Sequence, residues 1–144
     1  MYRIGDIYTV DFGQTNGSVQ SGVRPAIIVS NNTGNAKSPN VIVIPLTSKI
    51  KKTNMPTHIL IKSGESGLKV DSMALCENLI TVSKSQLIKK VGSVCYDDMS
   101  SITTGLFIAT TSLSFIDQNS INDFVQYLIT FGNNLNNIAP VNAA

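Results

Sequence analysis

Apolar and polar residues alternate along the first two thirds of the chain at the spacing of β-strands. Tyr8, Val10 and Phe12, for example, recur at every second position, which places them on one face of an extended segment. By this pattern and by runs of β-branched residues, strands are expected over residues 6–12, 24–30, 41–47, 57–62, 72–81 and 88–95. Pro25 and Pro45 lack a backbone donor, so each is expected at a strand start, an edge or a bulge.

The last third of the chain changes to helical spacing. Met99, Ile102, Leu106, Ala109 and Leu113 recur every three to four residues, which predicts a helix over 97–113 with Asp97 as its cap.

A second helix is expected over about 120–131. Ser120 and Asp123 have the spacing of a capping box at its start. Its apolar stripe consists of Ile121, Phe124, Val125 and Leu128. The Asn-rich tail that follows has little to bury and is expected to be loose.

Strands followed by helices predict an α+β fold that is mainly β. The expected architecture is a small, curled antiparallel sheet or barrel with C-terminal helices. A length of 144 residues suits one such domain.

Composition bears on the surface of the protein and on its location in the cell. Charged residues make up only 14% of the chain, against roughly 25% in an average domain, which suggests that a partner covers part of the surface. The net charge of +2 does not by itself indicate nucleic-acid binding, although basic residues can still cluster locally. The N-terminus has no apolar signal region and no run is long enough to span a membrane, so we expect a cytoplasmic protein.

The sequence offers few groups for metal or covalent chemistry. Cys76 and Cys95 lie far apart and the chain has one histidine, so we expect no zinc site, other metal or cofactor. His58 alternates with apolar neighbours and is interpreted as a partly packed structural residue. Phosphate-binding loops and hydrolase elbow motifs are absent from the sequence.

Arg24 is a candidate for phosphate recognition. It follows a long polar loop, precedes a buried strand and stands before Pro25, which favours an extended backbone and holds the guanidinium's base in place. The alternative is an ordinary surface arginine that enters a strand.

Thr47 ends a buried strand and is followed by a basic segment. Its hydroxyl, next to Ser48, Lys49, Lys51 and Lys52, can bind a phosphodiester, and lysines supply sequence-independent attraction. The alternative is a β-favouring threonine beside a solvated loop. Glu77 is a candidate base or RNA-facing group, or simply the exposed face of a strand.

Taken in order, these segments resemble the MazF/PemK family of toxin–antitoxin ribonucleases. The similar segments are RIGDIYTVDF, GSVQSGVRPAIIVSN, IPLTSKIKKTNMPTHILI and DSMALCENLITV, followed by the helix over 97–113. Together they cover roughly residues 2–115, which leaves 116–144 as a C-terminal extension packed on the same domain or at an interface.

The resemblance implies a strongly curved, SH3-like sheet that forms a homodimer. It implies metal-independent, sequence-specific cleavage of single-stranded RNA, in some members through the RNA's own 2′-hydroxyl. An antitoxin with a disordered acidic tail is the implied protein partner. Arg24 and Thr47 match the catalytic residues, and the implied RNA contacts are Ser18, Gln20, Gly22, Ser48, Lys49, Lys51, Lys52, Glu77 and Asn78.

The chain departs from the family pattern in one strand. Asn78 stands where the family often has glutamine, and Ile80 where it often has arginine. Ile80 therefore leaves a weakened RNA- or partner-binding module open. A separate alternative is a non-catalytic topoisomerase poison, as in the related CcdB proteins on the same fold, although the Asn- and Ala-rich C-terminus does not resemble theirs.

Overall fold

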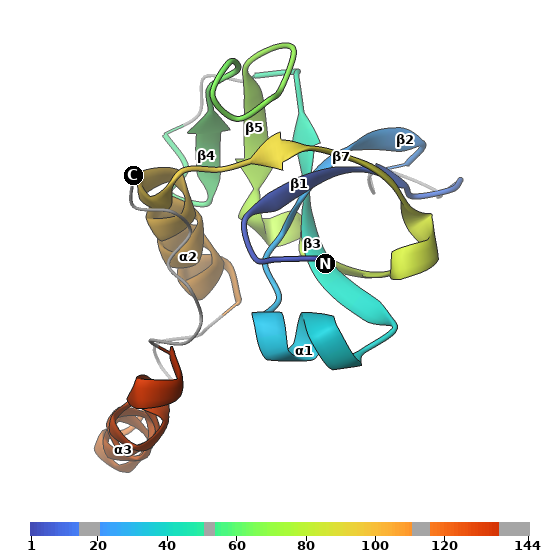
Figure 1. Cartoon of the computed structure of the whole chain (residues 1–144). Coiled ribbons are helices and arrows are strands. Elements are labelled where there is room, and N and C mark those ends of the chain that lie inside the picture. The colour runs from blue at the N-terminus through green and yellow to red at the C-terminus, as the bar shows by residue number, and fades with distance from the viewer. Residues whose placement is uncertain (15–20, 51–53, 111–115, 136–144) are drawn as a thin grey trace.

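The computed structural model describes residues 1–14, 21–50, 54–110 and 116–135 (Figure 1). Its strands are β1 (Asp6–Asp11), β2 (Val23–Ile28), β3 (Asn40–Thr47), β4 (His58–Ile61), β5 (Ser72–Leu75), β6 (Ile80–Ser83) and β7 (Leu87–Ser93). Its helices are α1 (Asn32–Lys37), α2 (Tyr96–Thr110) and α3 (Gln118–Leu135), with short 3₁₀ turns η1 (Cys76–Asn78) and η2 (Lys84–Gln86).

The strands form one sheet in which every recorded pairing is antiparallel. The order is β4-β5-β3-β2-β1-β7, and β6 also pairs with β3. The prediction of a mainly antiparallel sheet with C-terminal helices is confirmed. Among the described strands, no pairing joins β4 to β7 and closes the sheet into a barrel.

One side of β3 is shared by two strands. Its first half pairs with β6, ending at Val43 opposite Ile80, and its second half pairs with β5, beginning at Leu46 opposite Ala74. The single strand expected over 72–81 is therefore wrong, because η1 interrupts it. Pro45 lies at the gap between the two partners, where a missing N–H disrupts neither ladder.

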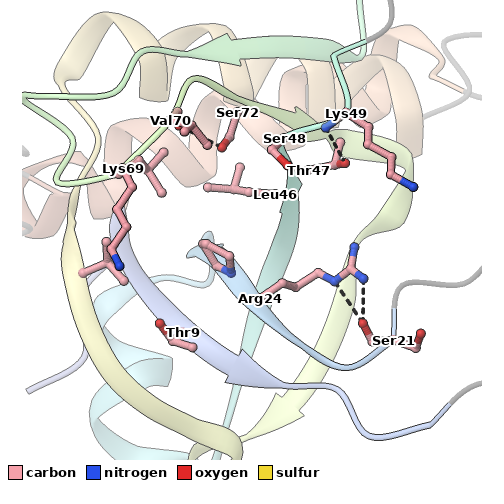
Figure 2. Close-up of a pocket in the computed structure, with 13 residues that line it drawn as sticks. Thr9, Ser21, Arg24, Leu46, Thr47, Ser48, Lys49, Lys69, Val70 and Ser72 are labelled. Atoms are coloured by element: carbon pink, nitrogen blue, oxygen red, sulfur yellow. Dashed lines mark hydrogen bonds between the residues drawn. The ribbon is translucent and has the colours of Figure 1, made fainter.

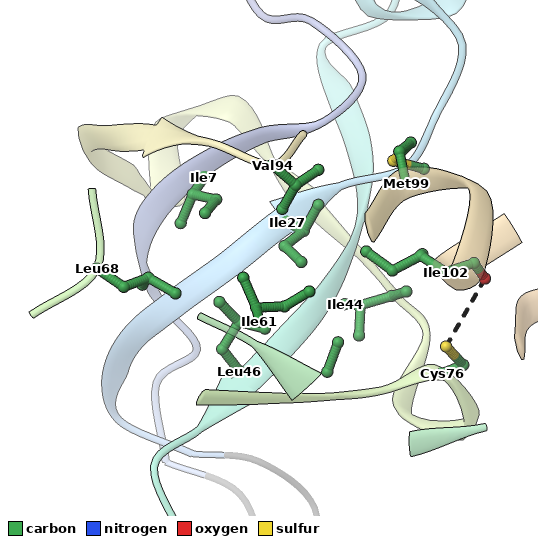
Figure 3. Close-up of a cluster of buried hydrophobic side chains, with 11 residues drawn as sticks. Ile7, Ile27, Ile44, Leu46, Ile61, Leu68, Cys76, Val94, Met99 and Ile102 are labelled. Atoms are coloured by element: carbon green, nitrogen blue, oxygen red, sulfur yellow. Dashed lines mark hydrogen bonds between the residues drawn. The ribbon is translucent and has the colours of Figure 1, made fainter. Parts of the chain in front are cut away.

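Alternate residues of the central strands enter two hydrophobic clusters on opposite faces of the sheet. Ile27 and Ile44 belong to the first cluster, whereas Ala26, Ile28 and Val43 belong to the second. The second cluster also holds Val10 and Phe12 with Tyr8 packed beside them, as the alternating pattern predicts. Figure 3 shows the first cluster, which the residues Met99 and Ile102 of α2 cover.

Helix α2 approaches the turn η1 closely through a glycine. A Cβ on Gly105 would lie 2.7 Å from Cys76 Sγ, so a larger residue would force the two elements to shift. The predicted apolar positions through Ala109 do pack on the core, whereas Leu113 lies outside the described residues. The predicted Asp97 cap is wrong, because α2 begins at Tyr96 and Asp97 lies inside its first turn. The Asp98 N–H is directed at Sγ of Cys95, the residue before the helix (3.5 Å).

Helix α3 is confirmed as a helix, and it lies apart from the sheet in Figure 1. Its cap is Asp117, whose Oδ1 accepts a hydrogen bond from the Ser120 N–H (2.8 Å), and not Ser120 as predicted. Ile121, Phe124 and Val125 are exposed. Among the helices that the structure describes, none combines the length and apolar character needed to cross a bilayer.

Candidate active site

A pocket of about 650 Å³ opens where β2 begins beside the end of β3. Its charged lining residues are all cations, Arg24, Lys49 and Lys69, and no Asp, Glu or His is among the described residues that line it. Such a pocket attracts anions. The other lining residues are hydroxyl-bearing or apolar: Thr9, Ser21, Pro25, Leu46, Thr47, Ser48, Leu68, Val70, Ser72 and Val91 (Figure 2).

Arg24 is held firmly at this pocket. Its backbone is part of β2, and its half-buried guanidinium donates from Nε (3.0 Å) and Nη2 (2.7 Å) to the carbonyl oxygen of Ser21. These two bonds restrict the side chain's rotamers. The interpretation of Arg24 as a firmly rooted cation agrees with this geometry.

The register of β2 with β3 brings Thr47 level with Arg24. The recorded pairing stops at Ala26 opposite Pro45. Arg24 lies two residues before Ala26 and Thr47 two residues after Pro45, so continuing the antiparallel register places them opposite each other. Both side chains line the same pocket. Thr47 Oγ1 accepts a hydrogen bond from the Lys49 N–H (3.1 Å), so its own hydrogen is available to donate to a ligand.

Pro25 explains why the strands separate at this point. The Val29 N–H donates to the Ile42 carbonyl (2.9 Å), and hydrogen-bonded positions in an antiparallel pair recur every second residue. Pro25 thus falls where β2 would donate to Leu46, and it has no donor. The ladder stops, and the space beyond it belongs to the pocket.

The polar loop before Arg24 is pinned at both ends. The Gly22 N–H donates to the Gly13 carbonyl (2.8 Å), and the Phe12 N–H to the Gly22 carbonyl (3.0 Å). Gly22 has a positive φ of 72°, a conformation that favours glycine. The predicted contacts Ser18, Gln20, Lys51 and Lys52 lie outside the described residues.

Glu77 and Asn78 lie in η1 and do not line the pocket. Glu77 Oε1 is instead 2.7 Å from Nε2 of the largely buried His58. Burial acts to raise the pKa of Glu77, but hydrogen bonds from its own N–H and from His58 outweigh burial and lower it. His58 is packed, as predicted, and its acidic partner is a relationship that the sequence did not indicate.

Several lining residues were not predicted. Lys69 and Val70 come from the segment between β4 and β5, Ser72 is the first residue of β5, and Thr9 comes from β1. Their positions depend on how distant segments pack, and the alternation of residues carries no signal for that.

The geometry suits recognition of a phosphodiester by charge and hydroxyl donors. Arg24 supplies a planar fork, Thr47 a directed hydroxyl, and Lys49 a point charge. Within the part of the chain that the structure describes, no three His, Cys, Asp or Glu side chains gather as a metal site would require.

Known proteins resemble the chain in both sequence and structure. A family model described as PemK-like, MazF-like toxin of type II toxin–antitoxin system matches residues 3–109. An Endoribonuclease MazF from Staphylococcus saprophyticus is 37% identical over 109 residues, which cover 76% of this chain and 91% of that protein.

Solved structures are similar in fold, and two of them illustrate the likeness. One is an endoribonuclease in complex with its cognate antitoxin from a mycobacterial species, with a TM-score of 0.65, 26% identity, and 81% of this chain and 99% of that chain covered. MazF from Deinococcus radiodurans has a TM-score of 0.64 with 19% identity, covering 74% of this chain and 93% of that chain, and this likeness concerns the fold alone. The chain belongs to the family of PemK-like, MazF-like toxins of type II toxin–antitoxin systems.

Proposed function

We propose that this toxin is an endoribonuclease that cleaves single-stranded RNA at short sequence motifs without a metal ion. The observation that carries the proposal is the meeting of Arg24 and Thr47 in one pocket whose described charges are all positive. The Staphylococcus relative, named an endoribonuclease, supports the same activity.

Arg24 is proposed to stabilise the charge that develops on phosphorus. In-line attack by a 2′-hydroxyl creates a phosphorane with extra negative charge, and one well-aimed donor is worth roughly 3–4 kcal/mol in comparable oxyanion sites. The bonds to the Ser21 carbonyl orient the guanidinium before substrate arrives. Because a guanidinium almost never deprotonates, Arg24 is unsuited to act as the base.

Thr47 is proposed to position the same phosphate. Its Oγ1 is oriented by the Lys49 N–H, which leaves the hydroxyl hydrogen to bond a non-bridging oxygen. Ser48 and Lys49 line the pocket beside it and supply further contacts to the RNA backbone. Gly22, Glu77 and Asn78 remain candidate RNA contacts outside the described pocket.

The proposed partners follow from the same charge pattern. An acidic, disordered antitoxin segment can fold over a basic pocket, and the mycobacterial neighbour is a complex with its cognate antitoxin. We further propose a cytoplasmic homodimer. The strongly curved, SH3-like form of the sheet and the division into 1–115 and a packed extension over 116–144 also remain proposals.

The activity is tested with purified protein and a long single-stranded RNA in the presence of EDTA. Wild type is expected to produce discrete fragments, and sequencing their 5′ ends gives the motif. Arg24→Ala and Thr47→Ala are expected to reduce the rate by roughly 10²–10³-fold, the cost of losing a transition-state donor.

Two further variants make the result specific. Arg24→Lys retains the charge but not the planar fork, and it is expected to recover little activity. Arg3→Ala removes an exposed arginine outside the pocket and is expected to cleave like wild type. Intact RNA at high wild-type concentration overturns the proposal, and binding without cleavage indicates an RNA-binding module instead.

A further inference from the structure

We propose that Lys69 is a positioning residue that binds a backbone phosphate adjacent to the scissile one. The inference rests on the proposed ribonuclease activity and extends it, because it gives the RNA a second anchoring point across the pocket. Lys69 lies on the opposite side of the pocket from Arg24 and Lys49, as Figure 2 shows.

The turn that carries Lys69 has a dense set of hydrogen bonds. Asp71 accepts from the Ser63 N–H (2.8 Å), from Ser63 Oγ (2.9 Å) and from Lys62 Nζ (3.0 Å). Ser66 Oγ donates to the Lys62 carbonyl (2.6 Å). These bonds tie the two ends of the turn together, so Lys69 starts from a fixed backbone.

The same turn is packed directly against β7. A Cβ on Gly67 would lie 2.4 Å from the Val91 carbonyl oxygen, and one on Gly92 would lie 2.1 Å from the Ser66 carbonyl oxygen. Gly67 also has a positive φ of 81°. Two glycines thus allow the backbones to touch, and Leu68, which is 6% exposed, anchors the segment in the core.

Lys69 is left to interact with a ligand. The nearest carboxylate in sequence, Asp71, is occupied by Lys62 and Ser63. Among the described residues, no ion pair or hydrogen bond is recorded for the Lys69 ammonium, and the residue is exposed. A firm backbone that holds a lysine at the rim of a pocket whose described lining residues include no acid suits binding of an anion.

The space between the cations fits a nucleoside. Its surface includes the apolar residues Pro25, Leu46 and Val91, and the exposed Val70 lies beside Lys69. A cavity of about 650 Å³ lies within the range of about 300–1,000 Å³ that small-molecule sites occupy. One nucleoside can therefore lie between a phosphate at Arg24 and Thr47 and a second phosphate at Lys69.

The test compares Lys69→Gln with Lys37→Gln. Both lysines are exposed, and both substitutions remove one charge. Lys37 lies near the other end of β3 from the pocket, because it ends α1 three residues before this eight-residue strand begins, whereas Thr47 ends the strand. Binding is measured with an RNA that contains the cleaved motif and a 2′-deoxy sugar on the 5′ side of the cleaved bond. Affinity falls as salt rises, and Lys69→Gln is expected to make this dependence shallower. The magnitude of the slope of log K against log salt should decrease by about 0.7, the value for one phosphate on a single strand. Lys37→Gln is expected to leave the slope unchanged.

A neutral phosphate identifies the contact. Methylphosphonate is placed in turn at each phosphate that flanks the cleaved bond. Wild type is expected to bind the RNA more weakly when one particular flanking phosphate is neutral. Lys69→Gln is expected to show no such loss at that phosphate, and to respond like wild type at the others. In cleavage assays the variant is expected to raise KM with little change in kcat.

The outcomes separate this inference from the proposed function. If wild type cleaves RNA but Lys69→Gln and Lys37→Gln have the same salt slope and the same methylphosphonate profile, the positioning role of Lys69 is overturned and the ribonuclease remains. If wild type neither binds nor cleaves RNA, the proposed function itself is overturned.

Discussion

His58 and Glu77 form a bond between the start of β4 and the turn η1, with 2.7 Å between Nε2 and Oε1. A histidine and a glutamate that the sequence did not connect thus bond to each other. Glu77 is also not among the described residues that line the pocket. Its lowered pKa makes it a weak base, because an effective general base has a pKa near the working pH.

Glu77→Gln is therefore expected to leave RNA cleavage within about tenfold of wild type, far from the roughly 10²–10⁴-fold cost of losing a general base. The folded-state pKa of Glu77 is lowered, so its stabilising contribution is present at neutral pH and lost as the pH falls through that value. Urea unfolding at pH 7 is expected to show a loss of up to about 1 kcal/mol, as for a partly exposed ion pair. A hundredfold loss of kcat with unchanged stability would instead make Glu77 catalytic.

The pH dependence of cleavage tests how the 2′-hydroxyl loses its proton. Since the described pocket-lining residues include no imidazole and no carboxylate, we expect hydroxide to remove this proton. The rate should then rise by about tenfold per pH unit between pH 6 and 8, measured under single-turnover conditions. A plateau with an apparent pKa near 6 or 7 contradicts this prediction.

Asp71 should make the protein sensitive to acid. Hydrogen bonds from the Ser63 N–H and from Lys62 lower the pKa of Asp71 from 3.8 to about 2. A carboxylate whose pKa is lowered on folding stabilises the protein above its unfolded value and loses that effect as the pH falls. The contribution should disappear between about pH 4 and pH 2.

The measurement is the urea midpoint at pH 5 and at pH 2.5. Asp71→Asn should be less stable than wild type at pH 5, and the difference should shrink at pH 2.5. Asp123→Asn, which alters an exposed carboxylate on α3, serves as the control and should have no such effect. An equal deficit for Asp71→Asn at both pH values would show that the carboxylate charge is irrelevant.

Gly105→Ala tests the close contact between α2 and η1. The new Cβ would lie 2.7 Å from Cys76 Sγ, so overpacking should cost about 1–3 kcal/mol, against a gain in helix propensity of about 1 kcal/mol. Chemical denaturation should show a net loss of stability. Ser101→Ala, at an exposed position of α2, controls for propensity and should not destabilise.

The double variant Gly105→Ala with Cys76→Ala identifies the clashing atom. Removal of Sγ makes room for the new methyl group, so the double variant should be more stable than the sum of the two single changes. Strict additivity would mean that the contact with Cys76 does not limit the spacing.

The sequence predicted what depends on local pattern. Strand positions such as Val10 and Phe12, and the apolar face of α2, follow from spacing alone. Arg24 and Thr47 were located by the order of motifs, and the register of β2 with β3 explains why they meet. Helix α1 was not predicted, because its six residues contain no apolar repeat and depend on the cap Asn31.

The rest of the pocket depends on contacts between distant segments. Lys69 reaches the pocket because Gly67 packs against Gly92, and neither glycine carries a signal for the other. The sequence did not indicate the interruption by η1 for a similar reason, since Cys76 is buried by α2 and the segment 72–81 contains no Gly or Pro that would mark a break.

Pro25 in β2 also bears on the affinity of the pocket for RNA. A residue with an N–H at position 25 would allow β2 and β3 to join further, and substrate would then have to select a minor, open population. Because Pro25 has no N–H, the hydrogen bond that would extend the ladder to Leu46 cannot form, so this pairing does not compete with RNA for the pocket. The substitution Pro25→Val would introduce that equilibrium, and the toxin's potency would then depend on how often the two strands part.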